Sequence, residues 1–524
     1  MAAENTASTD PADIAKRIAQ GYAFSGASLQ LGAVVIAGTA HPDAKVQIPL
    51  SVLNRHGLIA GATGTGKTKT LQGLAEQLSS AGVPVVVADI KGDLSGLVQP
   101  GQSNDKITER AADTGDDWQP TAFPVEFLAL GGLGTGVAVR ATVTAFGPVL
   151  LSKILDLNET QESSLGLIFH YADTAGLPLL DLKDLRSLIQ YLTSDEGKAD
   201  LEGIGGLSKQ TAGVILRNLI TVSNNGGDVF FGEPEWEPVD LLRTSPDGKG
   251  IISAIELATV QDKPQLFSTF LMWLLADLFH ELPEVGDPDK PKLVFFFDEA
   301  HLLFSGASKA FLDQVTQTVR LIRSKGVGIF FVTQVPADVP DSVLGQLGNR
   351  VQHALRAFTP DDAANLAKAV RTYPKTSDYD LAELLTQLGT GEAVVTVLSD
   401  RGSPTPVAWS RMRAPRSLMA QIDGAAQQQA VAASSLQAKY GRAIDRESAY
   451  EKLAARLAPP ADADAQSAPA PVPRSGTQAG PRAVPKARKD EGVLNVIKTV
   501  TGFANSPLGR EITRSIFGLA RRKK

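Results

Sequence analysis

Residues 61–68 read Gly61-Ala-Thr-Gly-Thr-Gly66-Lys67-Thr68, which satisfies the pattern G-x-x-x-x-G-K-[ST]. Glycines let the backbone curl until consecutive N–H groups point inward, at the oxygens of a phosphate. The lysine of this pattern places a positive charge on the β- and γ-phosphates, and the hydroxyl that follows it is a hard oxygen ligand for Mg²⁺. An apolar stretch (57–60) precedes the loop and a helical pattern (68–81) follows it, as the motif requires. The segment is therefore predicted to bind the phosphates of ATP, with Mg²⁺ as cofactor.

The predicted nucleotide-binding residues are those of this loop and of the helix that it opens. They are Gly61, Ala62, Thr63, Gly64, Thr65, Gly66, Lys67, Thr68 and Thr70. Lys67 is also predicted to take part in catalysis, and Thr68 to hold Mg²⁺. The positive N-terminal end of the helix adds to the attraction for phosphate.

A second element supplies the acidic groups that a phosphate loop needs. Residues 292–299 read Lys292-Leu-Val-Phe-Phe-Phe-Asp298-Glu299, a hydrophobic strand that ends in two carboxylates. Asp298 is predicted to hold Mg²⁺, mostly through water, and Glu299 to polarise the water that attacks the γ-phosphate. Such an Asp-Glu pair distinguishes motor-type ATPases from GTPases and most kinases. The alternative is a helix N-terminus at which two acids favour the dipole.

Further candidates lie downstream of the acidic pair. The buried stretch 328–333 ends at Gln334, which we predict to sense the γ-phosphate as the polar residue at the end of a neighbouring strand. Arg320 and Arg323 are three residues apart, so they share one face of a predicted helix. Either of them, or Arg350, is a candidate for a cation that completes the site of a neighbouring subunit. At the end of another strand, Asp89, Lys91 and Asp93 are candidates for the rim of the site.

The pattern of strands and helices predicts an α/β protein with a mainly parallel sheet and helices on both faces. Short runs rich in Val, Ile, Phe and Leu are typical of strands buried on both sides, and helical patterns lie between several of them. The runs are 83–90, 292–297, 328–333, 351–358 and 393–398.

The predicted domain organisation has six parts. They are an N-terminal helix with a short β lead-in (1–55), an ATPase core (56–150 and 226–415), an all-helical insertion (151–225), a helix (416–457), a disordered Ala/Pro-rich linker (458–490) and a basic amphipathic helical tail (491–524).

Composition limits the chemistry that the protein can perform. The chain has 524 residues, of which 43% are hydrophobic and 21% charged, so a fibrous or wholly disordered protein is excluded. It has no cysteine, which excludes disulfides, thiolate-held metals and a catalytic thiol. The start lacks the apolar region of a signal peptide, and the most apolar stretch (267–279) is too short to cross a bilayer. We therefore expect a cytoplasmic protein without an integral membrane segment.

The net charge of −6 conceals two regions of opposite sign. Residues 481–524 hold 11 basic and 3 acidic groups, a net of +8, so the other 480 residues carry 40 basic and 54 acidic groups, a net of −14. A basic amphipathic tail is typical of a segment that docks onto a partner protein, a membrane surface or nucleic acid. Its apolar stripe favours docking onto the protein's own assembly at least as much as a membrane role, and a protein partner, a membrane surface and nucleic acid all stay open as targets of the tail.

Together these elements resemble the HerA/FtsK group of ring-forming motor ATPases, and most closely its bacterial YjgR-like branch of HerA-like proteins. The residues that carry the resemblance are 61–68, 89–93, 295–301, 320–326 and 330–334, and it extends over about residues 25–415. It implies a RecA-like (ASCE-type) core, a homo-hexameric ring with ATP between subunits, and translocation on double-stranded DNA. By its place before Gly326, Arg323 best matches the arginine that acts across the subunit boundary. Archaeal HerA proteins carry a larger β-barrel before the loop, whereas here only about thirty residues are available for it.

A second hypothesis remains open from the sequence alone. The same ATPase site could drive the assembly of a complex or regulate a protein partner, without translocation on DNA. Stimulation of turnover by a protein and not by duplex DNA would favour this alternative.

Overall fold

The structure is a computed structural model that describes residues 10–201, 203–305 and 309–457. The predicted linker (458–490), helical tail (491–524) and tail-bound partner lie outside the described residues.

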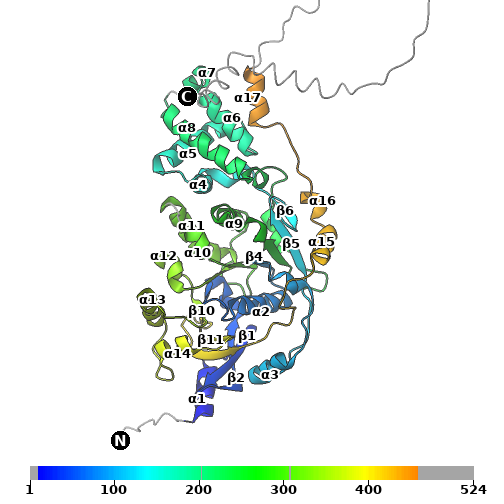
Figure 1. Cartoon of the computed structure of the whole chain (residues 1–524), viewed down its shortest axis with the longest axis vertical. Coiled ribbons are helices and arrows are strands. Elements are labelled where there is room, and N and C mark those ends of the chain that lie inside the picture. The colour runs from blue at the N-terminus through cyan, green and yellow to red at the C-terminus, as the bar shows by residue number, and fades with distance from the viewer. Residues whose placement is uncertain (1–9, 202, 306–308, 458–524) are drawn as a thin grey trace, which may run out of the picture. The chain divides into compact units, whose positions relative to one another are not determined.

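One twelve-stranded sheet organises the described chain, in the order β2-β1-β12-β11-β10-β3-β9-β8-β4-β7-β5-β6. In Figure 1 the hairpin β1–β2 lies at the end of the sheet near α1 (Pro11–Gln20), and β5 and β6 lie at the other end. The strands are β1 (Ser28–Ile36), β2 (Thr39–Pro49), β3 (Gly57–Ala60), β4 (Val85–Asp89), β5 (Val125–Leu130), β6 (Val137–Val139), β7 (Ile252–Glu256), β8 (Leu293–Phe297), β9 (Val327–Thr333), β10 (Asn349–Gln352), β11 (Glu392–Thr396) and β12 (Ala408–Met412).

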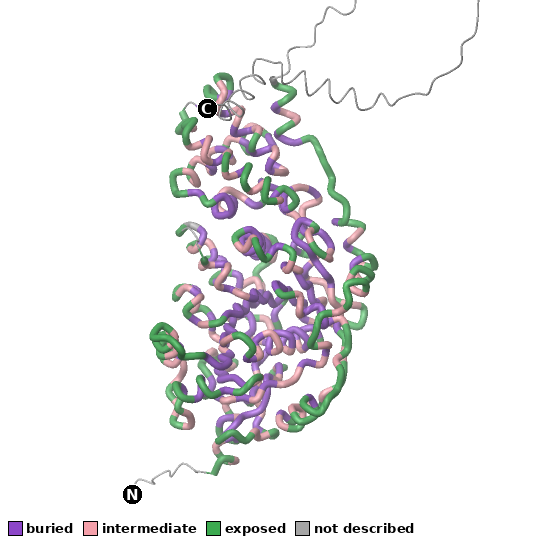
Figure 2. Tube along the Cα trace, viewed as in Figure 1, coloured by how far each residue is buried: buried purple, intermediate pink, exposed green. Residues whose placement is uncertain are grey.

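The sheet has a parallel part and an antiparallel part. All pairings from β10 to β6 in this order are parallel, and those from β2 to β10 are antiparallel. In the centre, β3, β4, β8 and β9 are buried at every position, so helices and loops cover both faces there (Figure 2). This confirms the predicted mainly parallel sheet with helices on both faces.

Several strands differ from their predicted positions. The predicted run 351–358 forms a strand only as far as Gln352, where β10 ends. Residues 356–361 are exposed. The strands β5, β6, β7 and β12 were not among the predicted runs. The predicted β lead-in is the hairpin β1–β2, which joins the main sheet through the pairing of β1 with β12.

Helices connect the strands. They are α1 (Pro11–Gln20), α2 (Lys67–Ser80), α3 (Asp105–Thr114), α4 (Val143–Ile154), α5 (Glu159–Thr174), α6 (Leu182–Leu192), α7 (Asp195–Lys198), α8 (Lys209–Asn224), α9 (Pro264–Glu281), α10 (His301–Phe304), α11 (Lys309–Ile322), α12 (Asp341–Leu344), α13 (Pro360–Arg371), α14 (Leu381–Gln387), α15 (Gly424–Ala432), α16 (Gln437–Tyr440) and α17 (Ala449–Leu457). Within the described ranges, no helix combines the length and the apolar character needed to span a bilayer.

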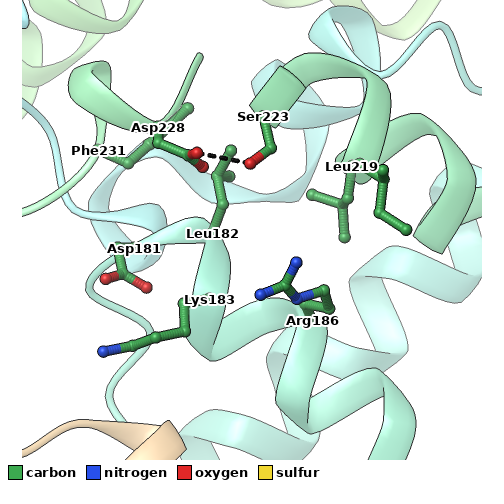
Figure 3. Close-up of a pocket in the computed structure, with 9 residues that line it drawn as sticks. Asp181, Leu182, Lys183, Arg186, Leu219, Ser223, Asp228 and Phe231 are labelled. Carbon is green, nitrogen blue, oxygen red and sulfur yellow. Dashed lines mark hydrogen bonds between the residues drawn. The ribbon is translucent and has the colours of Figure 1, made fainter. Parts of the chain in front are cut away.

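The segment between β6 and β7 is helical and includes α4 to α8. Its α4 packs against α9, which follows β7. A cavity of about 200 Å³ lies in this helical segment. Lys183 and Arg186 line it from α6, and Leu219 and Ser223 line it from α8, where the Ser223 hydroxyl donates to Asp228 at 2.5 Å (Figure 3). The cavity shares no residue with the phosphate loop.

After β12 the chain runs back along the molecule. Where the sequence predicted one or two helices over 416–457, the structure has the three short helices α15, α16 and α17. Residues 416 and 417 are tied to α2, because the backbone N–H groups of Arg416 and Ser417 donate to the buried Glu76 carboxylate at 2.8 and 3.0 Å.

Candidate active site

The predicted site residues meet at one edge of the sheet. The strands β3, β9, β8 and β4 are neighbours and run parallel, so their carboxyl ends lie side by side. The loop 61–66 follows β3, Gln334 follows β9, Asp298 follows β8 and Asp89 ends β4. Ligands of open α/β sheets bind at such carboxyl ends. Residues separated by more than 270 positions in sequence thus lie together at the carboxyl ends of these four strands.

The loop has a conformation that depends on its glycines. Gly61 has a φ of +152°, and a Cβ there would lie 2.5 Å from the Cβ of His353. Gly66 has a φ of +114° directly before α2. Side chains at these two positions would force the loop away from its neighbours. The loop therefore places the N-terminus of α2, with its free N–H groups, at the carboxyl edge of the sheet.

Three neighbouring strands hold the loop in place. The Gly61 N–H donates to the carbonyls of Thr333 and Gln334, at 3.2 and 3.1 Å, and the Ala62 N–H donates to the Ala354 carbonyl at 2.8 Å. From the start of β11, the Gly391 N–H donates to the Thr65 carbonyl at 2.9 Å. The loop is thus fixed to β9, to the end of β10 and to β11.

His353 lies against the loop, and the sequence pattern did not predict it as a residue of the site. Its Nε2 lies 2.9 Å from the Thr70 hydroxyl, and both side chains are buried. Burial lowers the pKa of His353 to about 4, so the imidazole is neutral at pH 7. The hydroxyl of Thr70, which was predicted to bind nucleotide, is thus hydrogen-bonded to His353. The two residues are far apart in sequence, and no local pattern links them.

Lys67 lies at the start of α2 and is nearly buried. Burial lowers the pKa of its ammonium, against the attraction of the Glu299 and Asp298 carboxylates. The ammonium donates to the Ala62 carbonyl at 3.2 Å, so it folds back over its own loop. Thr68, the predicted Mg²⁺ ligand, follows on the first turn of α2 and is partly exposed.

The acidic pair follows β8 directly. Asp298 is buried, and burial together with the charge of Glu299 raises its pKa to about 7. One oxygen of Asp298 accepts from the Glu299 N–H at 2.9 Å. Glu299 has a φ of +48°, an uncommon backbone conformation for a glutamate, which costs about 1–3 kcal/mol. Non-glycine residues in such strained conformations are common at functional sites, which makes Glu299 a candidate for a chemical role.

Gln334 lies at the same edge, with an exposed side chain. Thr333 before it is fully buried, and its hydroxyl donates to Asp338 at 2.5 Å. The backbone carbonyls of both residues accept from Gly61. Gln334 is therefore next to the loop, where a residue that contacts the γ-phosphate has to lie.

Of the three candidate arginines, Arg320 and Arg323 lie at the ends of the central strands opposite to the loop, whereas Arg350 lies within the sheet, in register with Leu58 of β3. Arg323 precedes β9 and pairs with Asp287 at 3.0 Å, and Arg320 is exposed at the end of α11. Arg350 lies in β10, and its guanidinium donates to the carbonyls of Leu344 and Leu347, which precede that strand. Since β9 has 7 residues, roughly 20 Å separate its two ends. The structure therefore does not bring Arg320 or Arg323 to the loop of their own chain, and the Arg350 guanidinium is engaged by the segment before β10.

Several buried polar atoms at this edge have no hydrogen-bond partner among the described residues. They are Asp93 Oδ1, Glu299 Oε2 and His301 Nδ1. Unsatisfied buried polar groups are rare in proteins and indicate a place for water, an ion or a ligand. Together with the N-terminus of α2, a hydroxyl and a carboxylate, they fit a nucleotide with Mg²⁺, whose preferred ligands are oxygens. No cluster of three or more acidic or histidine side chains that could hold a metal by themselves occurs in the described ranges.

The sequence matches one family model over most of its length. The model for the helicase HerA-like C-terminal family covers residues 35–524. Two similar proteins are DNA double-strand break repair helicases HerA, from Sulfolobus acidocaldarius and Sulfurisphaera tokodaii. Each is 21% identical to this chain over 71% of its length and 67% of the relative's, in alignments of 383 and 376 residues.

Solved structures share the fold. The plasmid coupling protein TrwB in complex with ADP and Mg²⁺ has a TM-score of 0.51 and is 15% identical, over 78% of this chain and 94% of that chain. TrwB in complex with a non-hydrolysable ATP analogue has a TM-score of 0.50, also at 15% identity, over 78% of this chain and 95% of that one. This likeness supports the RecA-like arrangement of the sheet. With the family model matching residues 35–524, the chain belongs to the HerA-like helicase C-terminal family of P-loop ATPases.

Proposed function

We propose that this protein is an ATP-driven motor that assembles into a hexameric ring and translocates on double-stranded DNA. The observation that carries the proposal is the meeting of the phosphate loop, the Asp298–Glu299 pair and Gln334 at the carboxyl edge of four parallel strands. The loop amides and Lys67 hold the phosphates, and Thr68 and Asp298 hold Mg²⁺. When bound, the metal neutralises the charge on the β- and γ-phosphates.

The arrangement supports hydrolysis by an activated water. The water oxygen forms a bond to the γ-phosphorus as the bond to the bridging oxygen breaks, and ADP leaves with the electron pair. Glu299 takes the proton of the water, and Gln334 contacts the γ-phosphate or the water. Lys67 and the loop amides stabilise the charge that develops in the transition state.

The position of the arginines supports a ring. A cation that stabilises the transition state raises the rate of phosphoryl transfer by about 10³–10⁵-fold. Arg320 and Arg323 lie at the end of β9 away from the loop, so we expect them to reach a nucleotide only in another copy of the chain. Arg323, whose Asp287 partner is more than half exposed, is the first choice for this role.

One finding supports DNA as the polymer along which the motor moves. The curated relatives are named as DNA double-strand break repair helicases. Apart from residues 481–524, the chain has a net charge of −14, so it offers no general positive field to DNA. We therefore expect DNA to contact a local basic surface, as in the pore of a ring.

Turnover of ATP with and without duplex DNA tests the proposal. We expect duplex DNA at low salt to stimulate turnover several-fold, and this stimulation to weaken steeply as salt rises, because phosphate contacts release counterions. Absence of both DNA binding and stimulation would contradict DNA translocation. Stimulation by a protein partner alone would favour an ATPase that regulates assembly.

A further inference from the structure

The predicted catalytic carboxylate is already engaged by a lysine from the neighbouring strand. The Lys91 ammonium lies 3.1 Å from Glu299 Oε1. The two residues follow β4 and β8, which pair in register so that Ala88 faces Phe297. Glu299 has only 13% of its side chain exposed, whereas that of Lys91 is half exposed. The pair thus joins a largely buried carboxylate to an ammonium at the rim of the site.

Lys91 is held in place by its own turn. The Asp89 carboxylate accepts from the Gly92 N–H at 2.7 Å and from the Leu94 N–H at 2.9 Å, which closes the turn around Lys91. From the segment after β12, Gln421 Nε2 donates to the Lys91 carbonyl at 2.8 Å. The backbone of Lys91 is therefore fixed on both sides, and its ammonium is presented to Glu299 from a rigid support.

The two oxygens of Glu299 have different surroundings. Oε1 is paired with Lys91, whereas Oε2 is buried without a hydrogen-bond partner among the described residues. His301 Nδ1, 3.4 Å from Oε2, is also buried without such a partner. A carboxylate with one oxygen held by an ammonium and the other without a hydrogen bond has the arrangement of a positioned base, whose partner fixes its orientation.

We propose that Lys91 is a positioning residue for Glu299: it holds one carboxylate oxygen so that the other faces the attacking water. The inference rests on the proposed ATPase function and deepens it. Lys91 acts through Glu299 and does not hold the nucleotide, so its loss lowers kcat and leaves nucleotide binding intact. Arginine at this position keeps the charge and the contact with Oε1.

Variants of Lys91 test the proposal in the full-length protein with Mg²⁺-ATP. Lys91→Met is expected to lower kcat by about 10–100-fold, a range typical of residues that orient a catalytic group, with KM within about 3-fold of the unchanged protein. Lys91→Arg is expected to recover most of the lost kcat. The matched control is Lys290→Met, because the Lys290 ammonium donates to the carbonyls of Ala81 and Gly82, away from the site. It is expected to leave kcat and KM unchanged.

A second arm shows whether Lys91 works through Glu299. In the Glu299→Gln background, Lys91→Met is expected to add no further loss to the single-turnover rate, because residues that act as a unit are non-additive. A further loss as large as in the unchanged protein would overturn the proposal. A higher kcat in Lys91→Met would also overturn it, because Lys91 would then hold Glu299 in an inactive position. A higher KM at unchanged kcat would overturn it as well, because Lys91 would then be a phosphate ligand.

The same variants separate this inference from the proposed function. If Glu299→Gln hydrolyses ATP at the unchanged rate, Glu299 is not the base and the proposed mechanism fails. If Glu299→Gln is slow and Lys91→Met is as fast as the unchanged protein, only the role of Lys91 fails.

Discussion

Replacement of Lys67 by alanine is expected to lower ATP turnover by about 10³-fold or more, because one preorganised charge contact to the transferred group is worth on the order of 4 kcal/mol. The ammonium is nearly buried beside Asp298 and Glu299, where few water molecules can replace it. Alanine leaves the charge of the β- and γ-phosphates without its nearest cation, so nucleotide affinity falls as well. Phosphate release and equilibrium binding of a fluorescent ATP analogue measure the two effects.

Lys69→Ala is the matched control for Lys67→Ala. Lys69 lies two residues further on in α2, and its ammonium donates to Gln72 at 3.0 Å and to the Met419 carbonyl at 3.1 Å. Its loss removes the same charge from the same helix and is expected to change turnover by less than about 5-fold. Near-normal turnover by Lys67→Ala would show that the loop does not bind the substrate.

Glu299→Gln is expected to lower kcat by about 10²–10⁴-fold while the protein still binds ATP. Glutamine has the shape of glutamate, but its amide cannot take a proton from water. Because Thr68, Asp298 and the loop remain, the nucleotide site keeps its ligands. Single-turnover hydrolysis, compared with the affinity for the same nucleotide, measures the separation of chemistry from binding.

A glutamate on the same edge provides the control. Glu256 ends β7, next to β4, and its carboxylate accepts from the Thr135 N–H at 2.6 Å. Glu256→Gln keeps the side chain's shape at a position without a chemical role in the proposed mechanism. Equal losses in the two variants would mean that any carboxylate on this edge has the same effect, which contradicts a specific base at position 299.

The central strands and the phosphate loop could be predicted because their signals are local. Leu293–Phe297 is an uninterrupted apolar run followed by two acids, and the glycines of 61–66 stand at fixed spacings. In contrast, β7 carries Ser253 and Glu256 within five residues, and β6 has only three residues, so neither shows a clear pattern. Such strands are set by their neighbours in the sheet and not by their own sequence.

The supports of the site could not be predicted, since they depend on contacts across the chain. His353 reaches Thr70 from 283 positions away, and Gln421 reaches the turn at Lys91 from 330 positions away. The sequence indicated Lys91 as a residue of the rim, but its partner Glu299 emerges only from the register of β4 with β8. A positive φ at Glu299 likewise has no counterpart in the sequence pattern.

A structure of the full chain with a non-hydrolysable ATP analogue and Mg²⁺, determined by cryo-electron microscopy, tests the central claim most directly. We predict a six-membered ring with the phosphates in the loop 61–66, the metal at Thr68 and Asp298, and Arg320, Arg323 or Arg350 of the adjacent subunit at the γ-phosphate. A nucleotide bound elsewhere, or a site completed within one isolated chain, would contradict the account.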